Sequence, residues 1–295
     1  MAEKFNIYSM VTDRIVAMMD NGIIPWERPW TGSTLCLKRH NGKPYSFINQ
    51  LLLSPNFDGS IESLNSGEFA TFKQIKDEGG HLNKGAKGIR VVFWKPLLVT
   101  KTDEDGTERQ EMIPFLRYST VFNIKDTDLE PKWSHEQVKV AEPNQMAEDI
   151  LETYWTTEGV KVHRDKLSGK AFYSPTSDSI TLPSIEQFED TAEYYSTAFH
   201  ESVHSTGHSS RLDRIKVAAM FGSNDYGKEE LVAEIGASAL VSICGIETPS
   251  SFRNNAAYIQ NWRNAIAKDN RLIISATGKA EKAVDRILNP VSSMV

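Results

Sequence analysis

The feature that most constrains the fold of this chain is the segment His200-Glu201-Ser202-Val203-His204, which lies in a stretch predicted to be helical. That helix is expected to begin near Asp190, because Glu193 follows three positions later, as at many helix starts. Residues four apart lie on the same face of a helix, so both imidazoles can reach one ion. The pattern predicts a metal site built on a long helix.

The residue types indicate what such a site can do. In the HExxH pattern two histidines bind zinc, and the glutamate between them takes a proton from the water on the metal. The metal lowers the pKa of that water, and the carboxylate completes its activation. We therefore predict His200 and His204 as ligands and Glu201 as the catalytic base. The alternative is a pair of exposed helical histidines beside an unrelated glutamate.

A third protein ligand is needed, because a catalytic zinc binds three side chains and keeps one position open. The longer pattern HExxHxxGxxH has its glycine at Gly207, but Ser210 stands at its last position. His208 is one residue past that glycine, and it stays open as an alternative ligand. His208 and Tyr226 are also weak alternatives for a group that stabilises an oxyanion.

The favoured third ligand lies further along, in Lys228–Glu234, since Glu-zincins complete the site with a glutamate on the following helix. Glu230 is the preferred residue, and Glu229 remains an alternative. Glu234 shares a face with Glu230, so we expect it to accept the spare N–H of a ligand histidine. Glu234 itself also remains open as the ligand. Acidic helix positions are more often simply solvated, but apolar neighbours indicate that this helix is buried.

The first half of the chain predicts a mixture of helix and sheet. Helical spacing of apolar residues covers residues 4–20, and residues 45–53 suit either a buried helix or a strand. A capping box formed by Thr71 and Gln74 begins a short helix. Residues 89–101 and 113–123 read as the two strands of a hairpin.

The second half places short strands before the HExxH helix and further helices after it, which is the order found in zincins. We expect a helix at 145–157, strands at 160–164, 170–174 and 179–183, and mostly helix from about 228. The strands around residues 174–178 offer a sheet edge to which a peptide substrate can add. The polar stretch 125–145, with two prolines, marks the boundary. The predicted fold class is α+β, with domains at 1–130 and 145–295.

The composition bounds the environment and the partners. The net charge of −6 argues against a general polyanion binder. Cys36 and Cys244 lie far apart and outside any CxxC pair, which suits a reducing compartment. The first residues lack the apolar stretch of a secretory signal, and no apolar run approaches membrane-spanning length. We expect a cytoplasmic protein with no membrane partner.

The first half combines aromatic and basic residues. Residues 28–101 hold 11 basic and 5 acidic side chains, a net charge of +6. Single-stranded nucleic acid binds surfaces where rings stack on bases and cations line the phosphates. Most tryptophans are core residues and most lysines are solvated, so this pattern alone is a weak signal. The residues chosen as DNA contacts are Trp26, Trp30, Lys84, Lys87, Arg90 and Trp94.

Motifs along nearly the whole chain resemble the ArdC antirestriction proteins of conjugative plasmids. In the first half they are PWERPW at 25–30, PYSFINQLLL at 44–53, KGAKGIRVVFW at 84–94 and VFN at 121–123. In the second half they are SPTSDSITLP at 174–183, HESVHSTGHSSRL at 200–212 and KEELVAEIGA at 228–237. One departure is Phe47, which stands where many relatives have glycine and could narrow or pad a groove.

The resemblance implies an N-terminal domain that binds single-stranded DNA and a C-terminal domain like a metallopeptidase, together protecting incoming plasmid DNA from host restriction. It carries the ligand role to His200 and His204 and the catalytic role to Glu201. The expected cofactor is one divalent metal, zinc first, with manganese as an alternative. The expected partners are single-stranded DNA and a protein substrate or host restriction machinery. Two other readings are a DNA-masking protein with a structural metal and a cytosolic peptidase without a DNA role.

Overall fold

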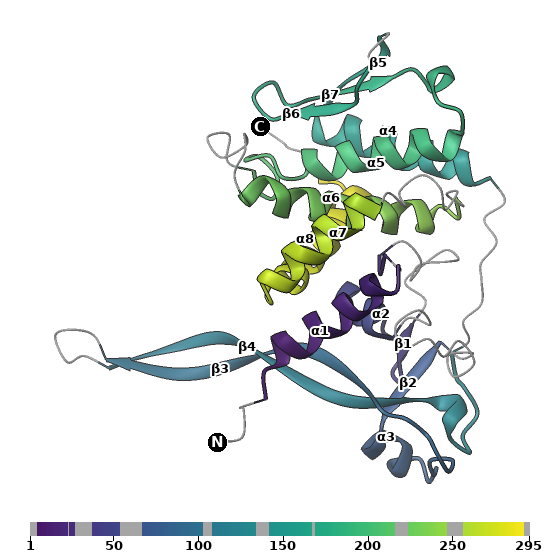
Figure 1. Ribbon diagram of the computed structural model, residues 1–295, viewed down its shortest axis with the longest axis vertical. Helices are drawn as coiled ribbons and strands as arrows, with labels where there is room; N and C mark the ends of the chain where they lie inside the picture. The colour runs from purple at the N-terminus through teal and green to yellow at the C-terminus, as the bar shows by residue number, and fades with distance from the viewer. Residues whose placement is uncertain are drawn as a thin grey trace.

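The protein is described from a computed structural model covering residues 5–22, 24–26, 37–53, 67–102, 108–133, 142–166, 169–215, 224–246 and 256–291. It has two domains of mixed helix and sheet, as predicted (Figure 1). The boundary expected at 125–145 falls partly on residues 134–141, which lie outside the described residues. The division into residues 1–130 and 145–295 therefore stays a prediction.

The N-terminal domain is organised around a four-stranded sheet with the order β1-β2-β4-β3. Its strands are β1 (Lys38–Arg39), β2 (Glu68–Thr71), β3 (Ile89–Thr102) and β4 (Glu108–Asn123). The β1–β2 pair is parallel and the other pairs are antiparallel. Strands β3 and β4 form the predicted hairpin and extend from the body of the domain as a long arm (Figure 1).

In the described part of this domain, three helices accompany the sheet, followed by the short 3-10 helix η2 (Ile124–Asp126). Asn6 is the N-cap of helix α1 (Ile7–Asp20), and its side chain accepts hydrogen bonds from two backbone N–H groups. The segment 45–53, predicted as either a helix or a strand, forms helix α2 (Phe47–Leu53). All residues of this helix are buried. Helix α3 (Phe72–Asp77) has the predicted capping box.

The C-terminal domain begins with helix α4 (Pro143–Glu158) and a three-stranded sheet with the order β5-β7-β6. Strands β5 (Lys161–Lys166) and β7 (Ser179–Pro183) are parallel, while β6 (Phe172–Ser174) is antiparallel to β7. After the 3-10 helix η3 (Ile185–Gln187) come α5 (Thr191–Ser205), α6 (Asn224–Ile243), α7 (Ala256–Lys268) and α8 (Leu272–Leu288). Among the described residues, no helix is long and apolar enough to cross a membrane.

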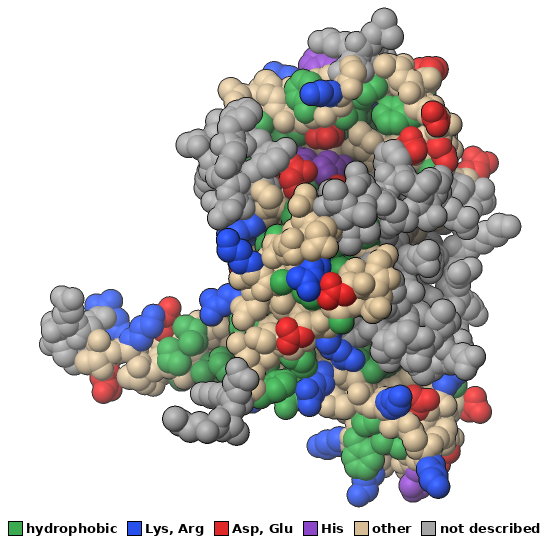
Figure 2. Space-filling model, viewed as in Figure 1, with side chains coloured by type: hydrophobic (Ala, Val, Ile, Leu, Met, Phe, Trp, Pro, Cys, Tyr) green, Lys and Arg blue, Asp and Glu red, His purple; other side chains and the backbone are tan. Residues whose placement is uncertain are grey.

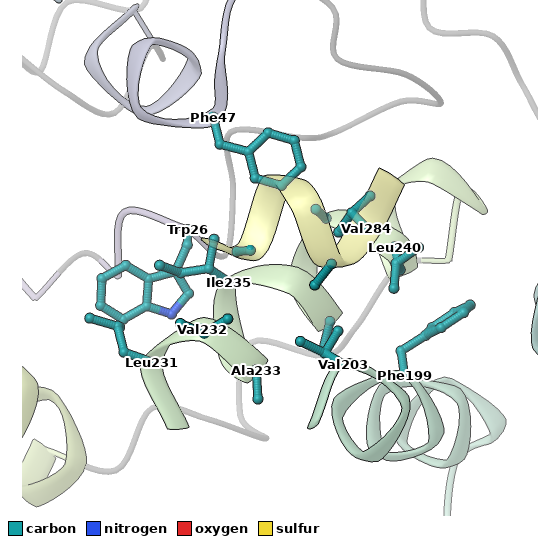
Figure 3. Packing of buried hydrophobic residues seen from close by; sticks show 14 of the residues in the cluster. Trp26, Phe47, Phe199, Val203, Leu231, Val232, Ala233, Ile235, Leu240 and Val284 are labelled. Atoms are coloured by element: carbon teal, nitrogen blue, oxygen red, sulfur yellow. The ribbon is translucent and has the colours of Figure 1, made fainter. Parts of the chain in front are cut away.

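One hydrophobic cluster joins the two domains. Trp26 is 1% exposed and lies beside Leu231 and Ile235 of α6, and Phe47 faces α8 (Figure 3). The Ser238 hydroxyl of α6 donates a hydrogen bond to the carbonyl oxygen of Trp26. Burial of two large aromatic rings between the domains stabilises their packing, since each removes a large apolar surface from water. The Phe47 ring therefore pads the core between the domains.

Helices α5 and α6 approach closely at a glycine. A Cβ atom added at Gly236 would lie 2.8 Å from Val203 Cγ2, which is closer than carbon atoms normally approach. Glycine at this position therefore lets the backbone of α6 pass near α5. This contact determines how side chains at the N-terminal end of α6 meet the histidines of α5.

Candidate metal centre

Helix α5 supplies two imidazoles to one point. Asp190 caps the helix by accepting a hydrogen bond from the backbone N–H of Ala192 at 2.8 Å. His200 and His204 lie one turn apart, and their Nε2 atoms are 3.1 Å from each other. Their side chains are 16% and 11% exposed, so both are largely removed from water.

Helix α6 brings a carboxylate to the same point. The Oε2 atom of Glu230 is 3.5 Å from His200 Nε2, and its Oε1 atom is 3.4 Å from His204 Nε2. The ligand atoms of the three residues lie within 4.8 Å of one another. We call His200, His204 and Glu230 the metal cluster. Two imidazoles and one carboxylate are a donor set that suits zinc and several other divalent metals.

Glu229 lies on the outer side of the cluster. Its Oε1 atom is 3.6 Å from His204 Nδ1, and Arg214 donates to both of its oxygens, at 2.8 and 3.2 Å. Arg214 also donates to the Val203 carbonyl and the Thr206 hydroxyl. This geometry favours Glu229 as the group that orients His204 rather than as a ligand.

Glu234 has the corresponding position beside the other histidine. Its Oε1 atom is 3.6 Å from His200 Nδ1, the nitrogen that points away from the cluster. Carboxylates at this position fix the orientation of a ligand imidazole and increase its basicity. The role predicted for Glu234 is compatible with this distance and stays a prediction.

Glu201 lies beside the metal cluster and is 8% exposed. Burial raises the pKa of its carboxyl group, although the neighbouring His200 and His204 act in the opposite direction. The carboxylate accepts a hydrogen bond from the backbone of Tyr173, which belongs to the edge strand β6. A buried carboxylate with a raised pKa is a stronger base, as general-base catalysis near neutral pH requires.

Carboxylates dominate the electrostatics of this region. Burial lowers the pKa of His204, but hydrogen bonds to Glu229 and Glu230 outweigh it and raise that pKa to about 10. Burial raises the pKa of Glu230, and its bonds to the two histidines reverse this and bring it well below the usual range. The site therefore attracts positive charge. Figure 2 shows histidine side chains in a hollow of the C-terminal domain with acidic side chains beside them.

His208, the other alternative ligand, lies elsewhere. Its Nδ1 atom is 2.8 Å from the Ser210 hydroxyl and 4.0 Å from an oxygen of Asp178, in the turns after α5. Asp178 is itself held by Arg211 and by the hydroxyl of Tyr173 at 2.8 Å. His208 therefore packs against the β6–β7 turn and does not join the metal cluster. The side chain of Tyr226 lies outside the described residues.

The residues chosen as DNA contacts fall into different environments. Trp26 is 1% exposed in the core between the domains, so its ring cannot stack on a base, and the structure corrects this choice. Its burial follows from its fit against α6, which no local pattern indicates. Trp30 lies outside the described residues. Trp94 is 53% exposed on β3.

Three of the basic residues predicted to contact DNA lie at the start of the arm. Lys84 and Lys87 are exposed in the loop before β3. The guanidinium carbon of Arg90 lies 5.0 Å from the centre of the Phe5 ring and 5.4 Å from that of Tyr118. This stacking holds the cation at the surface. Arg214 was not found from the sequence, because nothing in the residues near it indicates its contact with Glu229.

Helix α5 with its histidines, helix α6 with its glutamates and a small sheet whose edge strand borders the site define a zincin-like metallopeptidase domain. The family described as zincin-like metallopeptidase matches residues 149–279. The N-terminal domain of anti-restriction factor ArdC matches residues 5–122. Crystal structures of the antirestriction ArdC protein from plasmid R388 are 34% identical in sequence. The metal-free structure has a TM-score of 0.73 and the Mn(II)-bound structure 0.74.

These matches span the whole molecule. The alignment covers 96% of this chain and 97% of the metal-free ArdC structure, and 99% and 100% for the Mn(II)-bound one. The chain therefore belongs to the ArdC antirestriction family, as its motifs predicted.

Two Escherichia coli proteins named DNA primase TraC are 34% and 31% identical over 98% of this chain. The chain spans 28% and 20% of their length. An uncharacterised protein of Sinorhizobium fredii is 27% identical over 95% of this chain and 91% of its own length.

Proposed function

We propose that this antirestriction protein binds single-stranded DNA and holds one divalent metal in a peptidase-like site, and so protects incoming plasmid DNA from host restriction. The observation that carries the proposal is the convergence of His200, His204 and Glu230, whose ligand atoms lie within 4.8 Å of one another. The Mn(II)-bound structure of the R388 ArdC protein supports a divalent ion. Zinc and manganese both suit the donor set.

His200, His204 and Glu230 would hold the ion, while Glu229 and Glu234 orient the imidazoles from behind. When bound, the metal supplies Lewis acidity that polarises a carbonyl group and makes water more acidic. Arg214 neutralises Glu229 and fixes its position, with contacts of 2.8 and 3.2 Å. Glu201, Glu229, Glu230 and Glu234 lie around the two imidazoles, and this excess of carboxylates favours a cation over a neutral ligand.

Glu201 acts as the general base in this proposal. Its buried carboxylate accepts a proton from the attacking water, and its raised pKa matches that task. Strand β6 is an edge of the three-stranded sheet and borders Glu201 through Tyr173. An extended polypeptide could add to this edge and place a carbonyl group near the metal cluster. The protein partner would be an unidentified substrate or the host restriction machinery.

DNA binding is proposed for the N-terminal domain. Trp94 presents a half-exposed ring, and Lys84, Lys87 and Arg90 present cations near the base of the arm. Rings and cations on one surface bind single strands by stacking and by phosphate contacts. The match to DNA primases named TraC supports a nucleic-acid partner.

The Glu201→Gln variant tests whether the metal site works by catalysis. The amide keeps the size of the side chain but cannot take up a proton, so we expect normal metal content, measured by elemental analysis. Protection should fall to the level of a His204→Ala variant that lacks the metal. The assay is conjugative transfer of unmodified plasmid into a restricting host.

Full protection by Glu201→Gln would instead favour DNA masking with a structural metal. A wild-type protein that binds neither Mn²⁺ nor Zn²⁺ would contradict the metal assignment. A wild-type protein that does not bind single-stranded oligonucleotides would contradict the DNA assignment. The two parts of the proposal can therefore fail separately.

A further inference from the structure

A groove of about 920 Å³ separates the sheet of the N-terminal domain from helix α8 of the C-terminal domain. We call it the interdomain groove. One wall is α8, and the other consists of β3 with the region around β1 and α2. It is distinct from the metal cluster, because none of the residues of that cluster lines it.

The α8 wall carries two lysines over a floor of small residues. Ser275, Gly278, Lys279 and Lys282 are exposed and share one face of the helix at spacings of three and four. A Cβ atom added at Gly278 would meet nothing within 4 Å, so the floor is open there. Lys279 and Lys282 can therefore reach over the groove from the same wall.

The opposite wall is aromatic. Phe93 and Trp94 are consecutive residues of the edge strand β3, so their rings point to opposite faces of that strand. Both residues border the groove, and they are 41% and 53% exposed. Arg39 of β1 adds a cation, and its guanidinium carbon lies 5.5 Å from the centre of the Tyr45 ring. Large exposed rings on one side of a groove and lysines on the other are the two elements that a single strand of nucleic acid requires.

Glu281 is the acidic residue among the described residues that line this groove. Burial raises the pKa of its carboxyl group, which also accepts a hydrogen bond from the backbone N–H of Phe47 and faces Arg39. The Glu281 carboxylate therefore faces the first residue of α2. With Arg39, Lys279 and Lys282 counted against Glu281, three positive charges against one leave the lining with a net charge of +2.

We propose that the interdomain groove binds single-stranded DNA, with Lys279 and Lys282 of α8 contacting phosphates while Phe93 and Trp94 stack on bases. The inference rests on the proposed DNA-binding function and adds a part to it. The metallopeptidase-like domain supplies one wall of the DNA site. DNA binding therefore needs both domains in the arrangement seen here.

The first test neutralises the α8 wall. Fluorescence anisotropy with a labelled 30-nucleotide oligo-dT measures the affinity of the full chain across a range of NaCl concentrations. Each phosphate contact on a single strand contributes about 0.7 to the slope of log K against log salt. The double variant Lys279→Ala/Lys282→Ala should lower that slope by about 1.4. The control Lys161→Ala/Lys268→Ala removes the same charge outside the groove and should leave the slope unchanged.

The outcomes separate the two proposals. If wild-type protein does not bind the oligonucleotide, DNA binding itself is wrong. If wild-type protein binds, and the α8 variant has the same slope and affinity as the control, DNA binding stands and the groove assignment is overturned.

The second test fills the groove or removes its ring. Gly278→Leu projects a side chain into open space and replaces the glycine with a better helix former, so the fold should be retained. We expect at least a tenfold loss of oligo-dT affinity. Trp94→Ala should lose roughly 5- to 150-fold, the range for removing one stacked base contact. Circular dichroism melting checks that both variants fold.

The same variants assayed with fluorescein-labelled casein test the competing occupant, an extended polypeptide. Weaker casein binding with unchanged oligo-dT binding would assign the groove to a polypeptide and overturn the proposal. Unchanged affinity for oligo-dT in both Gly278→Leu and Trp94→Ala would overturn it as well.

Discussion

The metal cluster and the β3–β4 arm place their reactive side chains in opposite environments. In the cluster, His200 and His204 are 16% and 11% exposed, and neighbouring carboxylates hold their outer nitrogens. On the arm, large apolar side chains face solvent, with Trp94 at 53%, Leu98 at 54% and Met112 at 58% exposed. Figure 2 shows apolar and basic side chains together along the arm.

The difference reflects what each region would bind. An ion needs ligand atoms that converge within a few ångströms, so each ligand is fixed by partners on adjacent helices. A flexible polymer needs accessible rings and cations along a surface, and it could not contact these side chains if they were buried. Exposed apolar side chains in this number also mark an interaction surface in their own right.

The largest effect is expected from removing the third ligand. Glu230→Ala should abolish tight metal binding, because two imidazoles alone would remain to hold the ion. Isothermal titration with Mn²⁺ and Zn²⁺ measures this. The isosteric Glu230→Gln should also fail, since the neutral amide lacks the negative charge. Retention of wild-type affinity in both variants would show that another group is the ligand.

Two tryptophans sharpen the contrast between buried and exposed rings. Trp26→Ala should lower the free energy of unfolding by about 3–5 kcal/mol, because it empties a packed site between the domains. Trp94→Ala should change that free energy by no more than about 0.5 kcal/mol. Urea unfolding followed by circular dichroism compares them. Equal destabilisation would mean that the Trp94 ring is also a core residue.

The carboxylates behind the histidines should have an intermediate effect. Glu229→Gln should weaken metal binding by about 10- to 100-fold, as loss of a group that orients a ligand imidazole usually does. Glu234→Gln is the matched variant on the other histidine and should behave alike. Metal affinity by competition with a fluorescent chelator measures both. A complete loss of binding in Glu229→Gln would instead indicate that Glu229 is a ligand.

The smallest expected effect is the number of protons that the protein releases when it binds a metal, which depends on the pKa of His204. The pKa of His204 in the metal-free fold is about 10, above its value of 6.5 in the unfolded chain. Its protonation therefore stabilises the metal-free fold fully below pH 6.5, and this contribution disappears as the pH rises through about 10.

A metal must displace that proton, so binding near pH 8 should release about one proton. The apparent affinity should rise by up to about tenfold per pH unit as the pH rises towards about 10. Calorimetry in buffers of different ionisation enthalpy counts the protons. Binding without proton release would contradict a protonated His204.

Most of the secondary structure could be predicted from the sequence, because it depends on local periodicity and capping. The Asp190 cap, the capping box of Thr71 and Gln74 and the first strand of the hairpin lie where the patterns placed them. The second strand begins at Glu108, five residues before the predicted start. Residues 45–53 could not be assigned, because a short apolar run suits a buried helix as well as a buried strand. Packing against α8 makes this segment a helix.

The candidate site divides in the same way. The spacing of four residues in α5 brings His200 and His204 together whatever the rest of the chain does. Which glutamate of α6 faces them depends on how α6 rotates and how closely it approaches at Gly236. The sequence therefore ranked Glu230 above Glu229, and the geometry separates them: Glu230 faces both Nε2 atoms, and Glu229 faces Arg214.

For the DNA surface, composition alone selected aromatic and basic residues but not their environments. It could not separate the buried Trp26 from the exposed Trp94, because ring chemistry is the same in both. Composition also could not select Lys279 and Lys282, which lie 240 and 243 residues after Arg39 in the chain. The sequence determined the two imidazoles and the base between them, because one helix contains all three. Only the tertiary structure decided which carboxylate meets the imidazoles and which cations meet the rings, because those contacts join separate elements.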